Sequence, residues 1–363
     1  MGFTTDTLKY KAYTFKTRSE PIVIRDQEIK LQKQSDGSYN VPTSKILVKV
    51  YAAALNPVDL KIHNLAYWPV QFILGYQGLG KDYSGRIVAI GKKAQISTHL
   101  NVGDLVQGFY PHFSPTGTLS EYILVDGTNN ADKQITNIPS NITLAQAASW
   151  PLVYGTTYQL THDYNFTDKK VLILGGATSV GRYLIQVIKS KGAKEIIVTC
   201  SPRSVDLVKQ LGATNTIDYT QGSILNPTLE FVKDGTFDHI YDCIGNAELF
   251  PSIYDILPSD GSGNYQTIVG DGKSLNLSIK TITSYFTVFK RRFASIIHTL
   301  GYNYRLHLLN SDGDWIKEGR QLIEDGHLKI FVDTYFKFED LDKAIELLAT
   351  EKANGKVVVK IEE

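Results

Sequence analysis

A glycine-rich segment near the middle of the chain has residue types and a spacing that suit a bound phosphate. Residues 171–174 form a short apolar run, residues 175–181 read Gly-Gly-Ala-Thr-Ser-Val-Gly, and apolar residues then recur at helical spacing from Tyr183 to Ile188. A strand, a tight turn and a helix place unpaired N–H groups and the positive end of the helix dipole against an anion. The segment predicts a nucleotide-binding turn, with a plain strand-to-helix turn as the alternative.

This turn departs from the dinucleotide-binding fingerprint Gly-x-Gly-x-x-Gly, because Thr178 stands where the second glycine is usual. The hydroxyls of Thr178 and Ser179 are suited to capping the helix or bonding a phosphate oxygen. Gly181 is expected to let the helix approach the strand closely. We interpret the turn as a modified nucleotide site with consecutive candidate contacts, Gly176, Ala177, Thr178, Ser179, Val180 and Gly181.

The next apolar run, residues 195–200, bears on which nicotinamide cofactor binds. An NAD-specific site usually carries an acid at the end of this strand to bond the ribose 2′-hydroxyl. Here Ser201 and Arg203 follow instead, without an acid. A hydroxyl and a guanidinium suit a 2′-phosphate, so the sequence favours NADPH over NADH. The alternative is that Ser201 and Arg203 only cap the following helix, residues 205–211.

Three further cofactor contacts are predicted after later apolar runs. Tyr219 is expected to adjoin the same 2′-phosphate. Gly245 and Gly270 end two later strands, and ligands bind at the carboxyl ends of the strands in such sheets.

Composition limits the class of protein. The 363 residues allow two domains, and 42% hydrophobic with 21% charged residues is ordinary for a soluble globular chain. A net charge of +1 argues against a nucleic-acid partner. The two cysteines form no Cys-x-x-Cys pair, so neither a disulfide framework nor a structural zinc lobe is expected, and a reducing, cytoplasmic setting is favoured.

The order of predicted elements indicates an α/β fold. Residues up to 143 are rich in strand and turn signals, whereas helices and strands alternate from residue 144, which indicates a parallel sheet with helices on both faces. A helix is expected over 144–160 and the last strand of this sheet over 306–309. The tail then reads strand, helix and strand, over 330–338, 341–348 and 357–361.

Taken together, these segments resemble the medium-chain dehydrogenase/reductase family, and within it the zinc-independent, quinone-oxidoreductase-like branch. Ala-Ala-Leu-Asn-Pro-Val-Asp at 53–59 and Leu-Gly-Lys-Asp-Tyr-Ser-Gly at 79–85 carry the resemblance, with the glycine turn. Further matching segments are 102–106, 117–122, 211–213, 217–219, 242–245 and 355–359. The chain looks most like a fungal subgroup, some of whose members are associated with lipid droplets or mitochondria.

The resemblance implies an architecture and an activity. A partly open, GroES-like β-barrel domain would comprise residues 1–143 and 327–363, and a doubly wound Rossmann domain, residues 144–326, would bind NADPH. The implied activity is hydride transfer to a quinone, an enone or a related electrophilic carbonyl compound. The alternative is an NADPH-binding protein without turnover that acts as a sensor or scaffold.

The resemblance also bears on whether a catalytic zinc ion is bound. Zinc-dependent relatives have Cys where this chain has Asn56 and His where it has Lys81. Neither amide nor ammonium replaces these ligands, so no catalytic zinc is expected.

Candidate catalytic residues follow from the same branch. The Asn of the Asn-Pro-x-Asp motif lies near nicotinamide and substrate there, which implies that Asn56 bonds a carbonyl oxygen that gains charge; the alternative is a turn residue ahead of Pro57. Some relatives place a tyrosine shortly after this motif, where this chain has Lys61. Lys61 is then an electrostatic stabiliser or a solvated surface residue, and Tyr67 is a substitute that swings in.

One segment matches no family motif. Residues 285–298 mix aromatic and aliphatic residues with Lys290, Arg291 and Arg292. As a helix, this segment would suit a lipid surface. The alternative is a helix buried at a subunit interface, as in a homodimer, or over the active-site cleft.

Overall fold

The computed structural model describes residues 3–66, 75–111, 115–128, 135–270, 279–297, 299–311 and 314–362. The chain divides into two compact units, Met1–Gly155 with Asn310–Glu363, and Thr156–Leu309. These limits differ from the expected domains, because residues 144–155 and 310–326 belong to the first unit. Trp315 packs edge-on against Phe109 with ring centroids 5.9 Å apart, and the Asn141 side chain donates to the Ile323 carbonyl at 2.8 Å.

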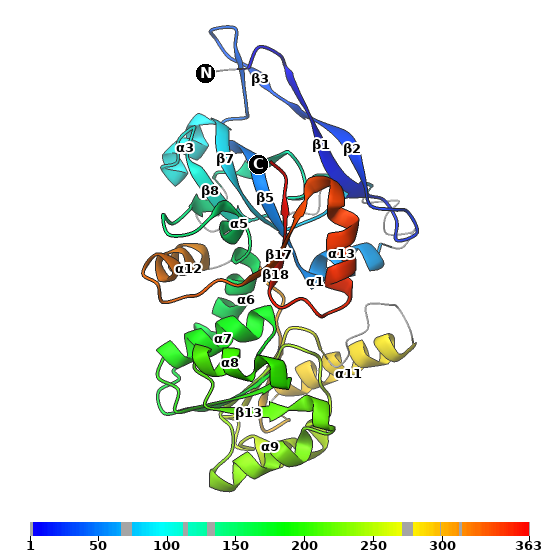
Figure 1. Ribbon diagram of the computed structural model, residues 1–363, viewed down its shortest axis with the longest axis vertical. Coiled ribbons are helices and arrows are strands. Elements are labelled where there is room, and N and C mark those ends of the chain that lie inside the picture. The colour runs from blue at the N-terminus through cyan, green and yellow to red at the C-terminus, as the bar shows by residue number, and fades with distance from the viewer. Residues whose placement is uncertain are drawn as a thin grey trace. The chain divides into compact units, whose positions relative to one another are not determined.

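The first unit is built mainly from antiparallel strands (Figure 1). Its strands are β1 (Thr7–Phe15), β2 (Val23–Lys30), β3 (Gln32–Lys33), β4 (Tyr39–Asn40), β5 (Lys45–Leu55), β6 (Gln77–Gly78), β7 (Asp82–Ile90), β8 (Leu105–Phe109), β9 (Tyr122–Asp126), β10 (Ile135–Asn137), β17 (Val332–Lys337) and β18 (Lys356–Lys360). Its helices are α1 (Pro57–Asn64), α3 (Lys92–Thr98), α5 (Leu144–Ala147), α12 (Trp315–Glu324), the short η5 (Phe338–Asp340) and α13 (Leu341–Ala349). The helix α6 (Pro151–Thr161) continues from this unit into the second.

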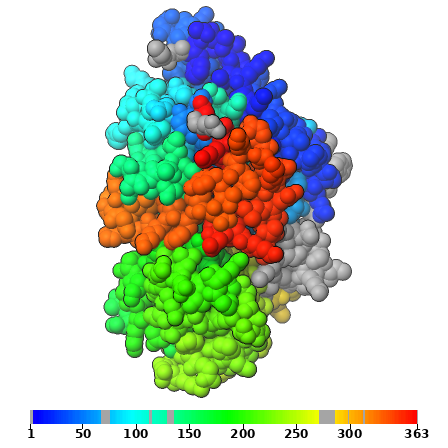
Figure 2. Space-filling model, viewed as in Figure 1, coloured from blue at the N-terminus to red at the C-terminus, as the bar shows by residue number. Residues whose placement is uncertain are grey.

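Strand β5 organises the main sheet, whose order is β10-β8-β7-β5-β18-β17. One edge of β5 pairs with β7, and its other edge pairs first with β9 and then with β18. Valine, leucine, isoleucine and alanine side chains of β5 are buried, which suits a strand covered on both faces. The C-terminal residues therefore complete a sheet begun near the N-terminus, and Figure 2 shows them among the earlier residues of this unit.

The second unit is a doubly wound parallel sheet. Its strands are β11 (Lys170–Leu174), β12 (Glu195–Cys200), β13 (Asn215–Asp218), β14 (His239–Asp242), β15 (Asn264–Thr267) and β16 (Asn303–Leu306). Its helices are α7 (Ser179–Ser190), α8 (Val205–Leu211), α9 (Leu225–Phe231), α10 (Ile253–Ile256) and α11 (Ile279–Ile296), with short turns η1 (Pro202–Ser204), η2 (Tyr219–Gln221), η3 (Val232–Asp234) and η4 (Phe250–Ser252). The strand order β13-β12-β11-β14-β15-β16, parallel throughout, is the classic dinucleotide-binding order, so the predicted α/β class is confirmed.

Two predicted elements differ from the structure. The helix expected over 144–160 is divided into α5 and α6, because Pro151 begins a new helix rather than continuing the first. The last strand, expected over 306–309, is β16 at Asn303–Leu306, where Tyr304 is buried against the sheet. The prediction rested on apolar residues at 306, 308 and 309. In the structure Leu308 is among the most exposed apolar side chains described, so it is not part of a buried strand.

Candidate functional sites

The predicted nucleotide turn connects β11 to α7 and is tightly packed. Gly175 has φ of 86°, a conformation that favours glycine. A Cβ on Gly176 would lie 2.6 Å from the Val198 Cβ, and one on Gly181 would lie 2.2 Å from the Gly175 carbonyl oxygen. Gly181 therefore has the predicted role, because its missing side chain lets the first turn of α7 approach the strand.

Backbone N–H groups are left open at the start of α7. Among the described residues, the N–H groups of Ala177, Ser179 and Val180 donate no hydrogen bond. Open N–H groups at the N-terminus of a helix can bind an anion. Thr178 is the N-cap residue: its hydroxyl donates to the Gly175 carbonyl at 2.7 Å and accepts from the Gly181 N–H at 3.1 Å. Of the two roles weighed for the Thr178 hydroxyl, the structure has the capping role.

Arg182 supports this turn and had no predicted role. Its side chain is 2% exposed, and its Nε donates to the Ala177 carbonyl at 2.9 Å. A buried guanidinium behind the turn adds positive charge near the open N–H groups and holds the peptide that precedes Thr178. Its place directly after Gly181 was the available signal, but an arginine in the first turn of a helix usually extends into solvent.

The structure brings the predicted adenosine-side residues together at the carboxyl ends of β12 and β13. Cys200 on β12 and Asp218 on β13 are register partners. Ser201 and Tyr219, the next residues, therefore lie just beyond the ends of neighbouring strands. Ser201 precedes η1 but its side chain forms no capping bond, which removes the capping alternative for this residue. Arg203 is exposed and forms no hydrogen bond or ion pair within the described ranges.

The acid closest to Ser201 by strand register is already engaged. Asp218 accepts from the Thr220 N–H at 2.9 Å, the Thr220 hydroxyl at 2.7 Å and the Gln221 amide at 3.2 Å. The Thr220 bonds lower the pKa of Asp218, which stabilises its ionised form. The carboxylate thus orders η2 and is not presented to a ribose in the manner of an NAD-specific acid.

Asp242 organises the loops that contain Gly245 and Gly270. The buried carboxylate accepts from the N–H groups of Ile244, Gly245 and Asn246 at 2.9, 2.8 and 3.0 Å. Thr267, its register partner on β15, accepts from the Gly270 N–H at 2.9 Å. The two glycines end neighbouring strands as predicted, but their N–H groups are used within the protein. Any cofactor contact at these positions would come from other atoms.

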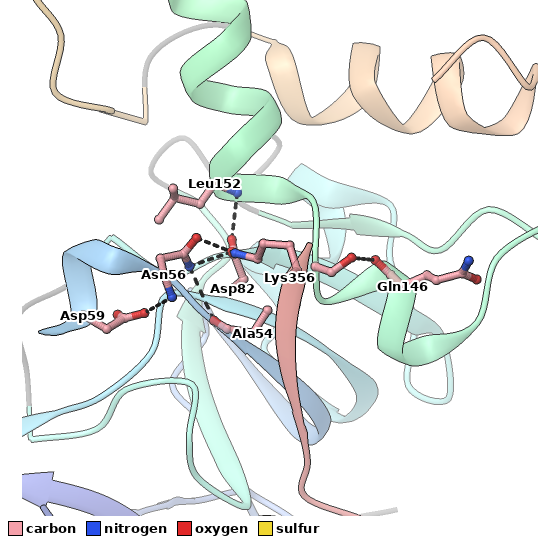
Figure 3. Close-up of polar contacts among 8 residues, drawn as sticks. Ala54, Asn56, Asp59, Asp82, Gln146, Leu152 and Lys356 are labelled. Atoms are coloured by element: carbon pink, nitrogen blue, oxygen red, sulfur yellow. Dashed lines mark hydrogen bonds and ion pairs between the residues drawn. The ribbon is translucent and has the colours of Figure 1, made fainter. Parts of the chain in front are cut away.

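A second polar centre, in the first unit, contains Asn56, Asp82 and Lys356 (Figure 3). The Asn56 amide nitrogen donates to the Asp82 Oδ2 at 2.9 Å, and Lys356 Nζ bonds both the Asn56 Oδ1 and the Asp82 Oδ2, the latter at 3.2 Å. The Leu152 N–H donates to the Asp82 Oδ1 at 2.7 Å. We call Asn56, Asp82 and Lys356 the buried triad; each is less than 5% exposed.

Strand register explains the buried triad. Leu55 pairs with Val357, and Ala54 pairs with Asp82, so β18 and β7 deliver Lys356 and Asp82 to the two sides of the end of β5, where Asn56 follows. Burial raises the pKa of Asp82, and the Lys356 ammonium and the Asn56 amide oppose that rise. No local pattern in the sequence predicts a role for Asp82 or Lys356, because Lys356 is 300 residues from Asn56 in the chain.

Two more buried charged residues adjoin the triad. Asp59, in the first turn of α1, accepts from the Asn56 N–H at 2.7 Å, and its other oxygen has no hydrogen-bond partner among the described residues. Burial raises the pKa of Asp59 to about 6, against the lowering effect of Lys356 and Lys81. Burial lowers the pKa of the Lys81 ammonium, which Asp59 opposes. Asn56 is also the N-cap residue of α1. It therefore has the predicted role ahead of Pro57, which does not exclude a catalytic role.

The remaining predicted residues stand as follows. Lys61 lies on α1, half-buried, and burial lowers the pKa of its ammonium, so it is not a fully solvated residue. Tyr67 lies outside the described residues. Within the described ranges, no group of three or more His, Cys, Asp or Glu side chains is arranged to hold a metal ion. The absence of zinc remains a prediction from the residue types at positions 56 and 81.

Comparison with known proteins agrees with both units. Residues 42–135 match the alcohol dehydrogenase GroES-like domain, and residues 211–359 match the zinc-binding dehydrogenase family. The solved quinone oxidoreductase from Coxiella burnetii has a TM-score of 0.73 and 23% identity over 98% of this chain and 100% of that one. The Escherichia coli quinone oxidoreductase complexed with NADPH has a TM-score of 0.70 and 17% identity over 98% and 100%.

The strand order, the GroES-like sheet and the two domain matches define a medium-chain dehydrogenase/reductase, as the resemblance implied, and its fold is like that of the solved quinone oxidoreductases. One relative identifies the subgroup within this superfamily. Protein YIM1-2 of Lachancea thermotolerans is 35% identical over 336 residues, which cover 88% of this chain and 90% of the relative. The chain belongs to the YIM1-like fungal proteins within that superfamily.

The raised pKa of Asp242, about 6, has a consequence for stability. Between about pH 4 and pH 6 the folded state holds a proton on Asp242 that the unfolded chain has released, so this residue's contribution to the free energy of unfolding falls as pH rises. The difference in unfolding free energy between the parent and Asp242→Asn should decrease across this range. Urea unfolding at several pH values measures it. A difference that stays constant or increases with pH would contradict the expectation.

Removal of the Lys356 charge should leave the Asp82 carboxylate buried without its ammonium partner. Lys356→Met is therefore expected to lower the free energy of unfolding by about 3–5 kcal/mol. Lys343→Met is the matched control, because it removes an exposed ion pair with Asp340 and should cost less than about 1 kcal/mol. Adding Asp82→Asn to Lys356→Met should cost less than the sum of the single changes. Urea unfolding decides, and equal effects at positions 356 and 343 would refute the claim.

Proposed function

We propose that this chain is an NADPH-dependent reductase that transfers a hydride to a quinone, an enone or a related electrophilic carbonyl compound, without zinc. The observation that carries the proposal is the open row of N–H groups at Ala177, Ser179 and Val180, followed one strand away by Ser201 and Arg203 rather than by an acid. The E. coli quinone oxidoreductase, of like fold, was solved in complex with NADPH. The substrate class rests on this likeness and on the family resemblance.

The residues of the second unit fit NADPH in the following way. The open N–H groups and the α7 dipole would bind the pyrophosphate, with the buried Arg182 behind them. Ser201, Arg203 and Tyr219 would surround the 2′-phosphate, Arg203 through a charge-assisted bond. When bound, NADPH supplies the hydride, and the protein has to orient the reactants and exclude water.

The buried triad offers a way to orient the acceptor. Lys356 bonds the Asn56 carbonyl oxygen and Asp82 accepts one amide hydrogen, so the amide is held against flipping. The second amide hydrogen has only a long contact, 3.4 Å, to the Ala54 carbonyl. We assign to that hydrogen the donation to the acceptor oxygen as charge develops on it. Lys61, half-buried on the same helix, would add positive potential.

A second function is favoured by the same network. Asn56 is 2% exposed, and both ends of its amide already have partners within the protein. A chain in which Asn56 never reaches a substrate would bind NADPH and act as a sensor or scaffold without turnover. Steady oxidation of NADPH in the presence of a panel of small quinones and enones separates this function from the reductase.

The cofactor preference can be tested directly. NADPH should bind about one to two decades more tightly than NADH, and Arg203→Ala should remove most of that difference, because a charge-assisted bond to the 2′-phosphate contributes roughly 1.5–3 kcal/mol. Lys209→Ala, an exposed lysine on α8, is the matched control and should leave the ratio unchanged. Fluorescence titration with both nucleotides measures the ratio. Equal affinities in the parent would defeat the argument.

Catalysis by Asn56 predicts a separation of kcat from cofactor binding. Asn56→Ala should lower kcat by about 10²–10³ and leave NADPH affinity nearly unchanged, since the proposed pyrophosphate and adenosine contacts belong to the second unit. Lys61→Ala should lower kcat by less, because its charge acts without a fixed bond. Urea unfolding of each variant shows whether the fold survives the substitution.

Loss of NADPH binding in Asn56→Ala, with the fold intact, would contradict this division of roles. A parent protein that binds NADPH yet reduces no quinone or enone would reject the reductase function and favour the sensor.

A further inference from the structure

Helix α11 is attached to its own unit through its polar and basic side chains. Arg291 lies over the Phe250 ring with its guanidinium carbon 3.4 Å from the ring centroid, and Arg292 donates to the Tyr304 carbonyl at 3.3 Å. The Ser295 hydroxyl oxygen accepts from the Tyr304 N–H at 2.9 Å. On the described part of the helix, Val288 is the apolar residue that joins the core. The face that contacts the protein is thus largely polar.

The opposite face is apolar and exposed. Three phenylalanines and two isoleucines lie along it, each more than half exposed, namely Phe286, Phe289, Phe293, Ile296 and Ile297. Their spacing, i, i+3, i+7, i+10 and i+11, is that of a single helical stripe. A helix of a globular domain normally turns such a stripe toward the core, so the arrangement on α11 is reversed. Contiguous exposed apolar surface of this kind marks an interaction site. We call these five residues the α11 stripe.

The charge around the stripe indicates what covers it. Between residues 272 and 311 the sequence contains no Asp or Glu. Of the basic side chains described on α11, Lys290 is exposed, whereas Arg291 and Arg292 contact Phe250 and Tyr304. In a two-fold contact with a second copy, this acid-free segment would face itself, and like charges would meet. A surface that combines acyl chains with negative headgroups satisfies both the stripe and its basic surroundings. Lys290, exposed directly beside Phe289, is placed to meet a headgroup.

No helix in the described ranges is long and apolar enough to cross a membrane. We propose that the α11 stripe docks the protein on anionic phospholipid bilayers, with the three phenylalanines inserted at the level of the headgroups. This inference is independent of the reductase proposal, because it uses neither the nucleotide turn nor the buried triad.

Co-sedimentation with vesicles tests the proposal. The full chain should bind vesicles of phosphatidylcholine with 30% phosphatidylserine (roughly the level that makes a leaflet strongly anionic) and should bind pure phosphatidylcholine vesicles less. Phe289→Ser with Phe293→Ser should lower partitioning at least about tenfold, because both rings leave the interface. Both side chains are exposed, so the double variant should fold as the parent does. Ile96→Ser, which alters an equally exposed residue on α3, is the matched control and should bind as the parent does.

A second measurement separates lipid from protein partners. Lys290→Glu should weaken binding to anionic vesicles and flatten its dependence on salt. Phe289→Trp should show a blue-shifted emission component only when anionic vesicles are added. Failure of the parent to bind these vesicles would overturn the proposal. So would a double variant that binds them as well as the parent, or one whose main effect is to dissociate a dimer detected by light scattering; the last result would assign the stripe to a second copy.

Discussion

The contact between Asp82 and Lys356 constrains the first unit more than any other single interaction described. Asp82 opens β7 and Lys356 opens β18, and both carboxylate and ammonium are almost fully buried. Neither charge would be tolerated there alone, so the pair requires the C-terminal strand to lie beside β5 in one register. The Asp82 carboxylate also fixes the start of α6 through Leu152, and Asn56 ties the same pair to the start of α1. One ion pair thereby joins segments from both ends of the chain.

The second unit solves a related problem with a carboxylate and no ammonium. Asp242 is buried at the end of β14, and three backbone N–H groups take the place of a cation. Burial raises the pKa of Asp242, and these hydrogen bonds oppose that rise. At the start of α7 the relation is reversed, because there the protein supplies positive groups, namely open N–H groups and the buried Arg182 guanidinium. One loop follows β11 and the other follows its neighbour β14, and they differ in which charge the protein itself supplies.

The two sites also differ in how much of their chemistry is internal. In the buried triad, amide, carboxylate and ammonium satisfy one another, so any substrate contact by Asn56 depends on the amide hydrogen that is left with a long contact. At the turn, the donors are open and their partner has to come from outside. A binding function therefore follows more directly from the turn than a catalytic function follows from the triad.

The sequence by itself determined the α/β fold class, the parallel sheet of the second unit and the nature of the glycine turn. Those features depend on local patterns: apolar runs of strand length, helical periodicity, and glycines where a side chain would collide with backbone. It also predicted that Ser201 and Tyr219 adjoin one phosphate, whereas the structure shows that the strands they follow are neighbours. Tertiary structure alone decided the rest. The roles of Asp82, Lys356 and Arg182 depend on burial and strand register. No local sequence pattern predicts the contact between Asn56 and Lys356. The outward direction of the α11 stripe was equally hidden, because periodicity identifies an apolar face but not what that face meets.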